Sequence, residues 1–464
     1  MIKYRRLIWA IVLLFLIILS LSVVLSFALR TKVRQRLDKE IATLTKDAYK
    51  ADFSTLEINL FALKASLRNV SLLPREKILS SDSAFGSLFI EKVEVNKPSF
   101  FWLFKKNPAV PKFNVTVSEL KYIFPDSLYY VDIGKVEYAW RDSSLLVRDL
   151  KYKSFVDQYQ FAYHDSKHSD WMDLELGRFR MENIALEELL HGKSLLVDHL
   201  SLDNVVFRNF KNQKIEITHH IMPILYEQIQ GIPYSFRIKQ VSINNLSVYY
   251  QELAKNGTDP GEIFFTEMNI ESGNFTNIPA TFTQTNQLSL SCKLMGEGQI
   301  NAQMYFPVDT AYNHAEIKGT LGPMTMISLN RIIEPLAFAR IKDGMIQGMD
   351  FHITGSKERA NIDICLLYQN LAVEIFKHDD DTSKIYGNIF LSALANTLIK
   401  KNNPENGELP RRVYAEYERD PLHSSFNYLW KIYFSGLIET LGYTKPLQKR
   451  VNRIREEVKQ LKGE

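Results

Sequence analysis

One spacing of apolar residues recurs along most of the chain. An apolar residue is followed by two polar residues, a second apolar residue, one polar residue and a third apolar residue, as at Leu67, Val70 and Leu72. A regular strand turns alternate side chains to one face, and one extra residue resets the two faces. The pattern therefore predicts a long antiparallel meander in which each strand is bent or bulged at one place.

The middle apolar residue of each phrase comes just after the three-residue step. We expect these residues to lie in strands, just past a bend, with side chains on the concave apolar face: Val70, Val93, Val136, Leu150, Phe179, Leu200, Val241 and Met268. A second three-residue step follows in three phrases, where Asn183, Asn204 and Asn245 lie. Asparagine tolerates turn conformations. The phrases are irregularly spaced, which argues against a fixed-period solenoid.

The stretch 316–376 contains the clearest pair of long strands. A first strand ends at Gly319, and a short helix follows, with these apolar residues at helical spacing: Leu329, Ile332, Ile333 and Leu336. Asp343-Gly344 is a hairpin turn signal, because glycine accepts the positive φ that such turns need. The sequence therefore predicts a strand, a helix, a turn at Asp343-Gly344 and then two long strands.

These two strands each have a strongly apolar face. Met349 and Phe351 alternate with polar residues on the first strand, and Ile362 and Ile364 do so on the second. We predict that these four residues continue the concave apolar face of the bent strands. The same residues are also consistent with the core of an ordinary β-sandwich, which would need a second layer over this face. Nothing in this stretch resembles a catalytic site.

The N-terminus contains an uninterrupted apolar run over residues 7–29. About 20 apolar residues span a bilayer as a helix. A cleaved signal peptide has a shorter apolar core and a small-residue cleavage site, which Ser26-Phe27-Ala28 matches poorly. We therefore expect a retained transmembrane anchor, preceded by a cytoplasmic tail over 1–6 and followed by a linker helix over 30–50. A count of positive residues alone favours a cytoplasmic C-terminal side.

The rest of the chain divides into a bent-strand repeat region over 51–315, a C-terminal β region over 316–424 and amphipathic helices over 425–464. The first of these helices has one apolar stripe: Phe426, Leu429, Tyr433, Leu437 and Leu441. The second has a heptad seam from Leu447 to Leu461. We expect this segment to pack on the sheet, while pairing with another helix and lying on an anionic membrane surface are the alternatives.

The amino-acid composition further limits the classes of function that the chain could have. Aromatic residues form 12% of the chain, which favours strands, and a net charge of +4 without clustering argues against a nucleic-acid partner. Cys292 and Cys365 lie in strand-like runs, so we expect buried free thiols, with a single disulfide as the alternative. His164 and His168 lie in a loop-like stretch that is a poor metal site. No zinc spacing, phosphate-binding loop or catalytic motif is present, and no catalytic residue, metal or cofactor is predicted.

The anchor, the bent-strand phrases and the stretch after Gly322 together resemble the AsmA-like family of anchored bacterial envelope proteins, which is related in architecture to TamB and to the eukaryotic chorein-type bridge proteins. The resemblance rests on the segments 56–74, 238–250 and 329–355. It implies an inner-membrane anchor with the bulk of the chain in the periplasm, contrary to the charge count. It also implies a groove-shaped sheet, apolar inside, that moves phospholipid toward the outer membrane. The eight middle residues of the phrases, together with Met349, Phe351, Ile362 and Ile364, are then the candidates that line this lipid groove.

The predicted fold class is mainly β, with an N-terminal transmembrane helix, an elongated, bent antiparallel sheet or groove, a few short helices and a C-terminal helical segment. The predicted function is phospholipid transport or outer-membrane biogenesis, with the inner membrane, phospholipid and other envelope proteins as partners. The alternative is a membrane-tethered envelope scaffold or assembly factor in which the apolar face is simply core. An enzyme is not expected.

Overall fold

The computed structural model describes residues 31, 34–35, 39, 43, 48–59, 62–75, 86–96, 114–164, 169–190, 194–215, 221–337, 339–378, 385–387 and 399–442. The chain divides into two compact units. Unit 1 contains residues 1–156 and 174–187, and unit 2 contains residues 157–173 and 188–464. This division falls inside the predicted repeat region 51–315, whereas strand pairing continues across the predicted boundary at 315–316.

Several predicted elements lie outside the described residues. They include the anchor over 7–29, most of the linker helix over 30–50, His168, and the helix with the heptad seam from Leu447 to Leu461. In the part of the chain that the structure does describe, no helix combines the length and the apolar character that a membrane span requires.

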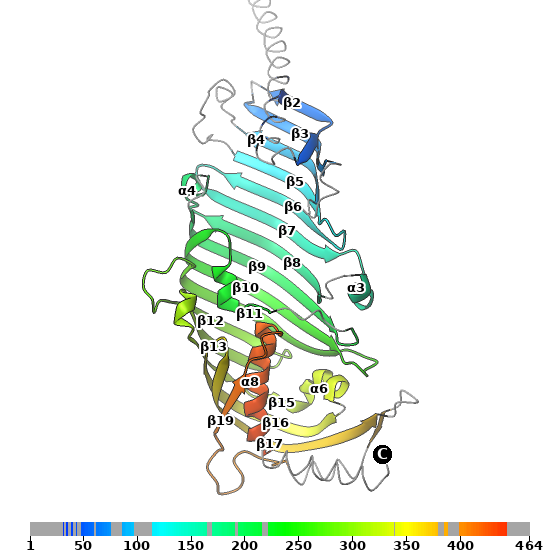
Figure 1. The fold of residues 1–464 in the computed structure, drawn as a ribbon, viewed down its shortest axis with the longest axis vertical. Coiled ribbons are helices and arrows are strands. Elements are labelled where there is room, and N and C mark those ends of the chain that lie inside the picture. The colour runs from blue at the N-terminus through cyan, green and yellow to red at the C-terminus, as the bar shows by residue number, and fades with distance from the viewer. Residues whose placement is uncertain are drawn as a thin grey trace, which may run out of the picture. The chain divides into compact units, whose positions relative to one another are not determined.

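Unit 1 is an antiparallel sheet whose strands follow one another along the chain (Figure 1). Its strands are β1 (Tyr49–Asp52), β2 (Thr55–Asn59), β3 (Lys64–Pro74), β4 (Ser87–Asn96), β5 (Asn114–Ile123), β6 (Tyr129–Ala139), β7 (Ser144–Ser154) and the part of β8 (Trp171–Glu182) from residue 174 onward. Both β1 and β2 pair with β3, and each strand from β4 to β8 pairs with the preceding one. The predicted meander is confirmed for this unit.

Unit 2 is also built on a sheet. Its strands pair in the order β9 (Ser194–Asn212), β10 (Ser235–Leu253), β11 (Gly261–Thr276), β12 (Thr285–Leu294), β13 (Gly298–Pro307), β14 (Ala315–Leu321), β16 (Ala339–Gly355), β17 (Arg359–His378) and β19 (Val413–Glu418). The short strands β15 (Met324–Thr325) and β18 (Ile385–Gly387) pair with β16 and β17. The prediction of mainly β structure is confirmed.

One strand pair corrects the expectation of a wholly antiparallel sheet. The strands β9 and β10 are parallel over their whole length. Parallel neighbours need a crossover connection rather than a tight turn. Here the connection includes α5 (Leu225–Gln230). The sheet of unit 2 is therefore mixed.

The remaining helices are short, apart from the last one. They are α3 (Gln158–His164), α4 (Leu186–Leu190), the 3₁₀ turns η2 (Thr310–Tyr312) and η3 (Met326–Leu329), α6 (Asn330–Ala337) and α8 (Ser425–Thr440). The helix α6 confirms the predicted helix before Asp343, and its moderate length agrees with Pro335 near its end.

The predicted hairpin at Asp343-Gly344 is wrong. The strand β16 continues through both residues, and its register with β17 shifts on either side of Asp343. Gly344 has a φ of 147°, so these residues form a bulge within the strand. A further register shift follows Ile346, and Ile346 is buried while Met345 is exposed. A glycine that suits a turn also suits a bulge, so local sequence cannot separate them.

The predicted bends form one continuous crease across unit 1. Each strand leaves one residue out of the ladder at the same row: Asn69, Glu91, Glu119, Gly134, Asp149 and Gly177. From β3 to β7 the crease residue has a positive φ in every second strand, at Asn69 (50°), Glu119 (50°) and Asp149 (56°). The crease therefore accounts for the three-residue step in the sequence.

Unit 2 contains comparable interruptions. Asn204 and Asn245 lie side by side on the parallel strands β9 and β10 with φ values of 57° and 56°. The side-chain amide of Asn245 donates to Oδ1 of Asn204 at 2.9 Å, and the backbone amide of Asn245 donates to Oδ1 of Asn269 at 3.1 Å. In unit 1, Asn183 has a φ of 54°. The three asparagines at the second three-residue step thus have the left-handed backbone that occurs in turns.

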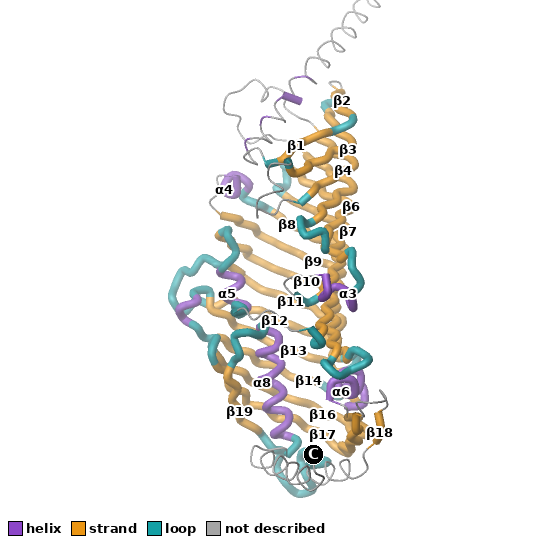
Figure 2. The backbone as a smooth tube through the Cα atoms, turned by 45° about the vertical axis from the view of Figure 1, so that its right-hand side comes forward, coloured by secondary structure: helices purple, strands orange, loops and turns teal. Residues whose placement is uncertain are grey.

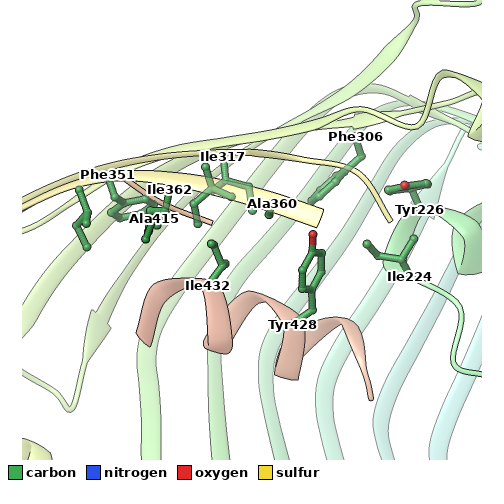
Figure 3. Packing of buried hydrophobic residues seen from close by; sticks show 12 residues of the cluster. Ile224, Tyr226, Phe306, Ile317, Phe351, Ala360, Ile362, Ala415, Tyr428 and Ile432 are labelled. Atoms are coloured by element: carbon green, nitrogen blue, oxygen red, sulfur yellow. The ribbon is translucent and has the colours of Figure 1, made fainter. Parts of the chain in front are cut away.

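The main apolar core of unit 2 lies between its sheet and α8 (Figure 2). Tyr428 and Ile432 point from the helix to the strands, where they meet Ile362 and other buried residues (Figure 3). Tyr433 and Phe351 contact each other edge to face, with ring centroids 4.8 Å apart. Gly436 allows the close approach, because a Cβ there would lie 2.8 Å from Cγ2 of Ile364. The first of the two predicted C-terminal helices therefore packs on the sheet, and the second lies outside the described residues.

Candidate functional site

The apolar residues of unit 1 form four rows that cross the strands on one face of the sheet. Residues paired across a ladder share a face, and the crease keeps that face on both of its sides. The two rows next to the crease are Val70–Ile90–Leu120–Ile133–Leu150–Leu176 and Leu67–Val93–Val117–Val136–Val147–Phe179. The outer rows are Leu72–Leu88–Tyr122–Val131–Tyr152–Leu174 and Ala65–Val95–Val115–Tyr138–Leu145–Met181.

This apolar face of unit 1 is only partly covered. Of the 24 residues in the four rows, all except Val147 and Leu176 are half-buried and none is fully exposed. A residue packed between two layers would have neighbours on every side and lose almost all of its exposure. The face is therefore a continuous and partly exposed apolar surface.

Aromatic rings line one margin of this face. Tyr129 and Tyr152 stack with ring centroids 4.5 Å apart, and Phe124 meets Tyr152 edge to face at 5.8 Å. Burial, and secondarily the nearby carboxylate of Asp126, raises the pKa of Tyr152 to about 12. The phenol stays neutral at physiological pH, so this margin adds apolar area without adding charge.

The opposite face of the unit 1 sheet is polar and charged. Lys64 and Lys92 both contact Glu94, at 2.6 and 2.8 Å, and Lys135 contacts Glu137 at 2.7 Å. A hydrogen bond from Lys64, followed by one from Lys92, lowers the pKa of Glu94 below its ordinary value of 4.5. The sheet is therefore amphipathic, with one face suited to water and the other to hydrocarbon.

Two apolar rows also cross the unit 2 sheet. They are Leu200–Val241–Ser272–Leu288–Met304–Ile317–Ile353–Ile362–Ala415 and Leu202–Ile243–Ile270–Leu290–Ala302–Gly319–Phe351–Ile364–Val413. Exposure falls along these rows: Leu200 and Val241 are half-buried, whereas Phe351, Ile362 and Ile364 keep 6%, 1% and 0%. The difference coincides with α8, which covers the end near β17.

All eight residues predicted from the bent-strand phrases lie in strands. Val70 and Leu150 share one row of unit 1, and Val93, Val136 and Phe179 share the row across the crease. In unit 2, Leu200 and Val241 are paired directly, and Met268 is buried beside a bulge of β11. The predicted residues of each unit are thus brought together on its apolar face.

The four residues predicted on the last long strands have a different environment. Met349 is half-buried, but Phe351, Ile362 and Ile364 lie in a packed core beneath α8. Sequence reasoning missed the residues that cover them, Tyr428, Ile432 and Gly436. Their spacing of four, with the small Gly436 at the closest approach, is the signal that could have found them.

Polar chemistry in unit 2 lies on the other face of its sheet. A hollow of about 810 Å³ is lined mainly by hydrogen-bonding side chains, among them Ser289, Asn301 and Thr320. Such a lining suits water rather than hydrocarbon.

Cys292 and Cys365 are free and buried, as expected, and burial raises the pKa of Cys292 to about 11. Among the described residues, no cluster of His, Cys, Asp or Glu could hold a metal ion.

The chain matches no protein-family model and no curated protein. Its class is defined by its own geometry, as a mainly β protein with amphipathic creased sheets. The apolar face of unit 1 is suited to contact with hydrocarbon.

Proposed function

We propose that this chain is a membrane-anchored lipid carrier in which the apolar face of unit 1 holds phospholipid acyl chains. The single observation that carries the proposal is the continuous set of half-buried apolar rows across β3 to β8. Each methylene transferred from water to such a surface contributes about 0.8 kcal/mol, so an acyl chain laid across the rows would be held firmly without any polar contact.

The location of the carrier is part of the same proposal. The apolar run over 7–29 anchors the chain in the inner membrane, and the AsmA-like resemblance puts the bulk of the chain in the periplasm. There it would serve phospholipid transport and outer-membrane biogenesis together with other envelope proteins. A phosphatase reporter fused after Glu464 should be active, and a cytoplasmic reporter at the same site should be inactive.

The lipid-carrying step is tested by recovering bound lipid from the purified full chain. We expect mass spectrometry to find phospholipid with the wild-type chain. Val136→Asp should lower the recovered amount at least about tenfold, because roughly 1.4 kcal/mol of lost binding is already tenfold. Ser118→Asp is the matched control, since Ser118 lies on the polar face beside Lys92 and Lys135. Equal recovery from both variants, with unchanged melting, would contradict the proposal.

A second candidate function is a tethered envelope scaffold without a lipid path. The observation in its favour is the packed core under α8, where the apolar face of unit 2 is filled by the chain itself. The scaffold predicts that the wild-type chain yields no phospholipid above the amount recovered from an unrelated anchored protein purified in the same way. The same mass-spectrometric experiment therefore separates the two functions.

A further inference from the structure

The helix α8 has apolar residues on both of its sides. The side toward the sheet carries Tyr428, Ile432 and Gly436, which are all buried. The opposite side carries Phe426, Trp430 and Phe434, which keep 43%, 37% and 44% exposure. A helix with one side in water usually has polar residues on that side, and a helix that is apolar all round is usually buried. The outer side of α8 is therefore more apolar than its exposure to water favours.

The three outer aromatic residues, which we call the outer stripe, form one surface. Trp430 and Phe434 stack with ring centroids 6.0 Å apart. Phe426 meets Tyr250 of β10 with centroids 5.3 Å apart, so the stripe continues onto that strand of the sheet. Residues 426 to 434 cover roughly 12 Å of helix at about 1.5 Å per residue, a length comparable to much of an acyl chain.

An exposed cation borders this stripe. Lys431 follows Trp430 directly, is exposed, and makes no ion pair with any residue that the structure describes. Its ammonium group can accept a phosphate as a partner. An aromatic stripe with a cation at its flank matches an amphiphile that has a hydrocarbon tail and an anionic headgroup.

We infer that the outer stripe of α8 is a binding surface for a phospholipid, with the acyl chain on Phe426, Trp430 and Phe434 and the phosphate at Lys431. The inference rests on the proposed function and deepens it. In unit 2 the lipid lies over the helix, and the sheet residues Phe351, Ile362 and Ile364 beneath the helix never meet it.

Trp430 provides a direct probe of this contact. In a full chain whose other tryptophans (Trp9, Trp102, Trp140 and Trp171) are replaced by Phe, all fluorescence comes from Trp430. This protein is reconstituted with phosphatidylglycerol and phosphatidylcholine brominated in the acyl chains, because bromine quenches an indole only on near contact. We expect strong quenching of Trp430. We expect weak quenching when the only tryptophan is placed by Tyr414→Trp on the outward side of β19, where residue 414 is 74% exposed.

Charge variants complete the test. Phe434→Asp should reduce the quenching of Trp430 several-fold without lowering the melting temperature, because residue 434 is already exposed. Tyr414→Asp is the matched control and should leave the quenching unchanged. Lys431→Glu should weaken quenching by brominated phosphatidylglycerol. These results together support the inference.

Other outcomes overturn it. If Trp430 is not quenched, or is quenched no more than the indole of the Tyr414→Trp variant, the stripe does not bind lipid. If quenching appears only after the chain is ended at Gly442, the occupant is the chain's own C-terminal segment. If the quenching of Trp430 by brominated lipid rises when the protein is diluted, the occupant of the stripe is a second copy of this chain. In each case, lipid that is still recovered from the wild type and lost in Val136→Asp would show that the carrier function survives and only this inference has failed.

Discussion

The apolar faces of the two units have similar rows but different covers. In unit 1 the apolar rows around Val136 and Leu150 are partly exposed. In unit 2 the apolar rows around Ile362 and Ile364 are buried beneath α8. The spacing of apolar and polar residues in the sequence is alike for the strands of the two units. The comparison shows that an apolar strand face does not determine whether it becomes a binding surface or a core, because that depends on a segment supplied from elsewhere in the chain.

The largest effect is expected when one charge is placed on the apolar face of each unit. Ile364→Lys should lower the free energy of unfolding by several kcal/mol, since a buried charge without a partner costs that much after relaxation. Val136→Lys should cost less than about 1 kcal/mol, because water reaches a half-buried site and surface changes are usually small. Urea unfolding of both variants measures the difference. Equal losses would mean that both faces are packed core.

A second test displaces α8, the helix that covers the apolar face of unit 2. Gly436→Val forces α8 away from Ile364, because a Cβ at residue 436 would lie 2.8 Å from Cγ2 of that residue. Overpacking of this kind costs about 1–3 kcal/mol. Ser435→Val, at the neighbouring half-buried position of the same helix, controls for the helix propensity of valine. If thermal melts show the same loss for both, α8 does not depend on close packing at Gly436.

A third test concerns the crease of unit 1, which bends the open face. Glu119 has a φ of 50°, while Glu91 in the same crease row does not have a positive φ. Glu119→Gly should therefore raise the free energy of unfolding by about 1 kcal/mol, whereas Glu91→Gly should lower it by about 0.5–1 kcal/mol. Opposite signs in chemical denaturation would support the alternating backbone conformation. A loss at both positions would contradict it.

The smallest expected effect is electrostatic and lies on the polar side of unit 1. The pKa of Glu94 is lowered in the folded state, so its contribution is present above the ordinary value of 4.5 and disappears as pH falls through the folded pKa. Glu94→Gln should cost less than about 1 kcal/mol at neutral pH, as exposed ion pairs do. The cost should vanish in acid and shrink in high salt. A loss that is constant with pH would assign it to packing.

Much of the fold could be predicted from local pattern. The three-residue step locates the crease, because an unpaired residue changes which face the following residues share, as at Asn69 and Val70. Asn204 and Asn245 indicate left-handed backbone, since asparagine adopts it at little cost. These features depend on a few neighbouring residues, and sequence reports such features well.

Other features depend on residues far apart in the chain. Asp343-Gly344 suits a turn and a bulge equally, and only the pairing of β16 with β17 selects the bulge. The parallel arrangement of β9 and β10 depends on where a crossover returns the chain. The cover over Ile364 comes from Ile432, 68 positions later in the sequence. No local pattern contains these choices, so the candidate groove could be placed on strands while its open and closed parts could not be told apart.

The crease has a consequence for how such a chain can grow. Left-handed residues occur in every second strand from β3 to β7, so the repeating element of the sheet is a pair of strands, and neither strand alone is complete. Duplication of one hairpin, such as β6 with β7, would insert a whole period and keep every crease residue aligned with its neighbours. Insertion of one strand would break this alternation, because two crease residues of the same conformation would then lie side by side. Lengthening by hairpins therefore preserves the cross-section of the sheet, and gene duplication could extend its reach without redesigning its surface.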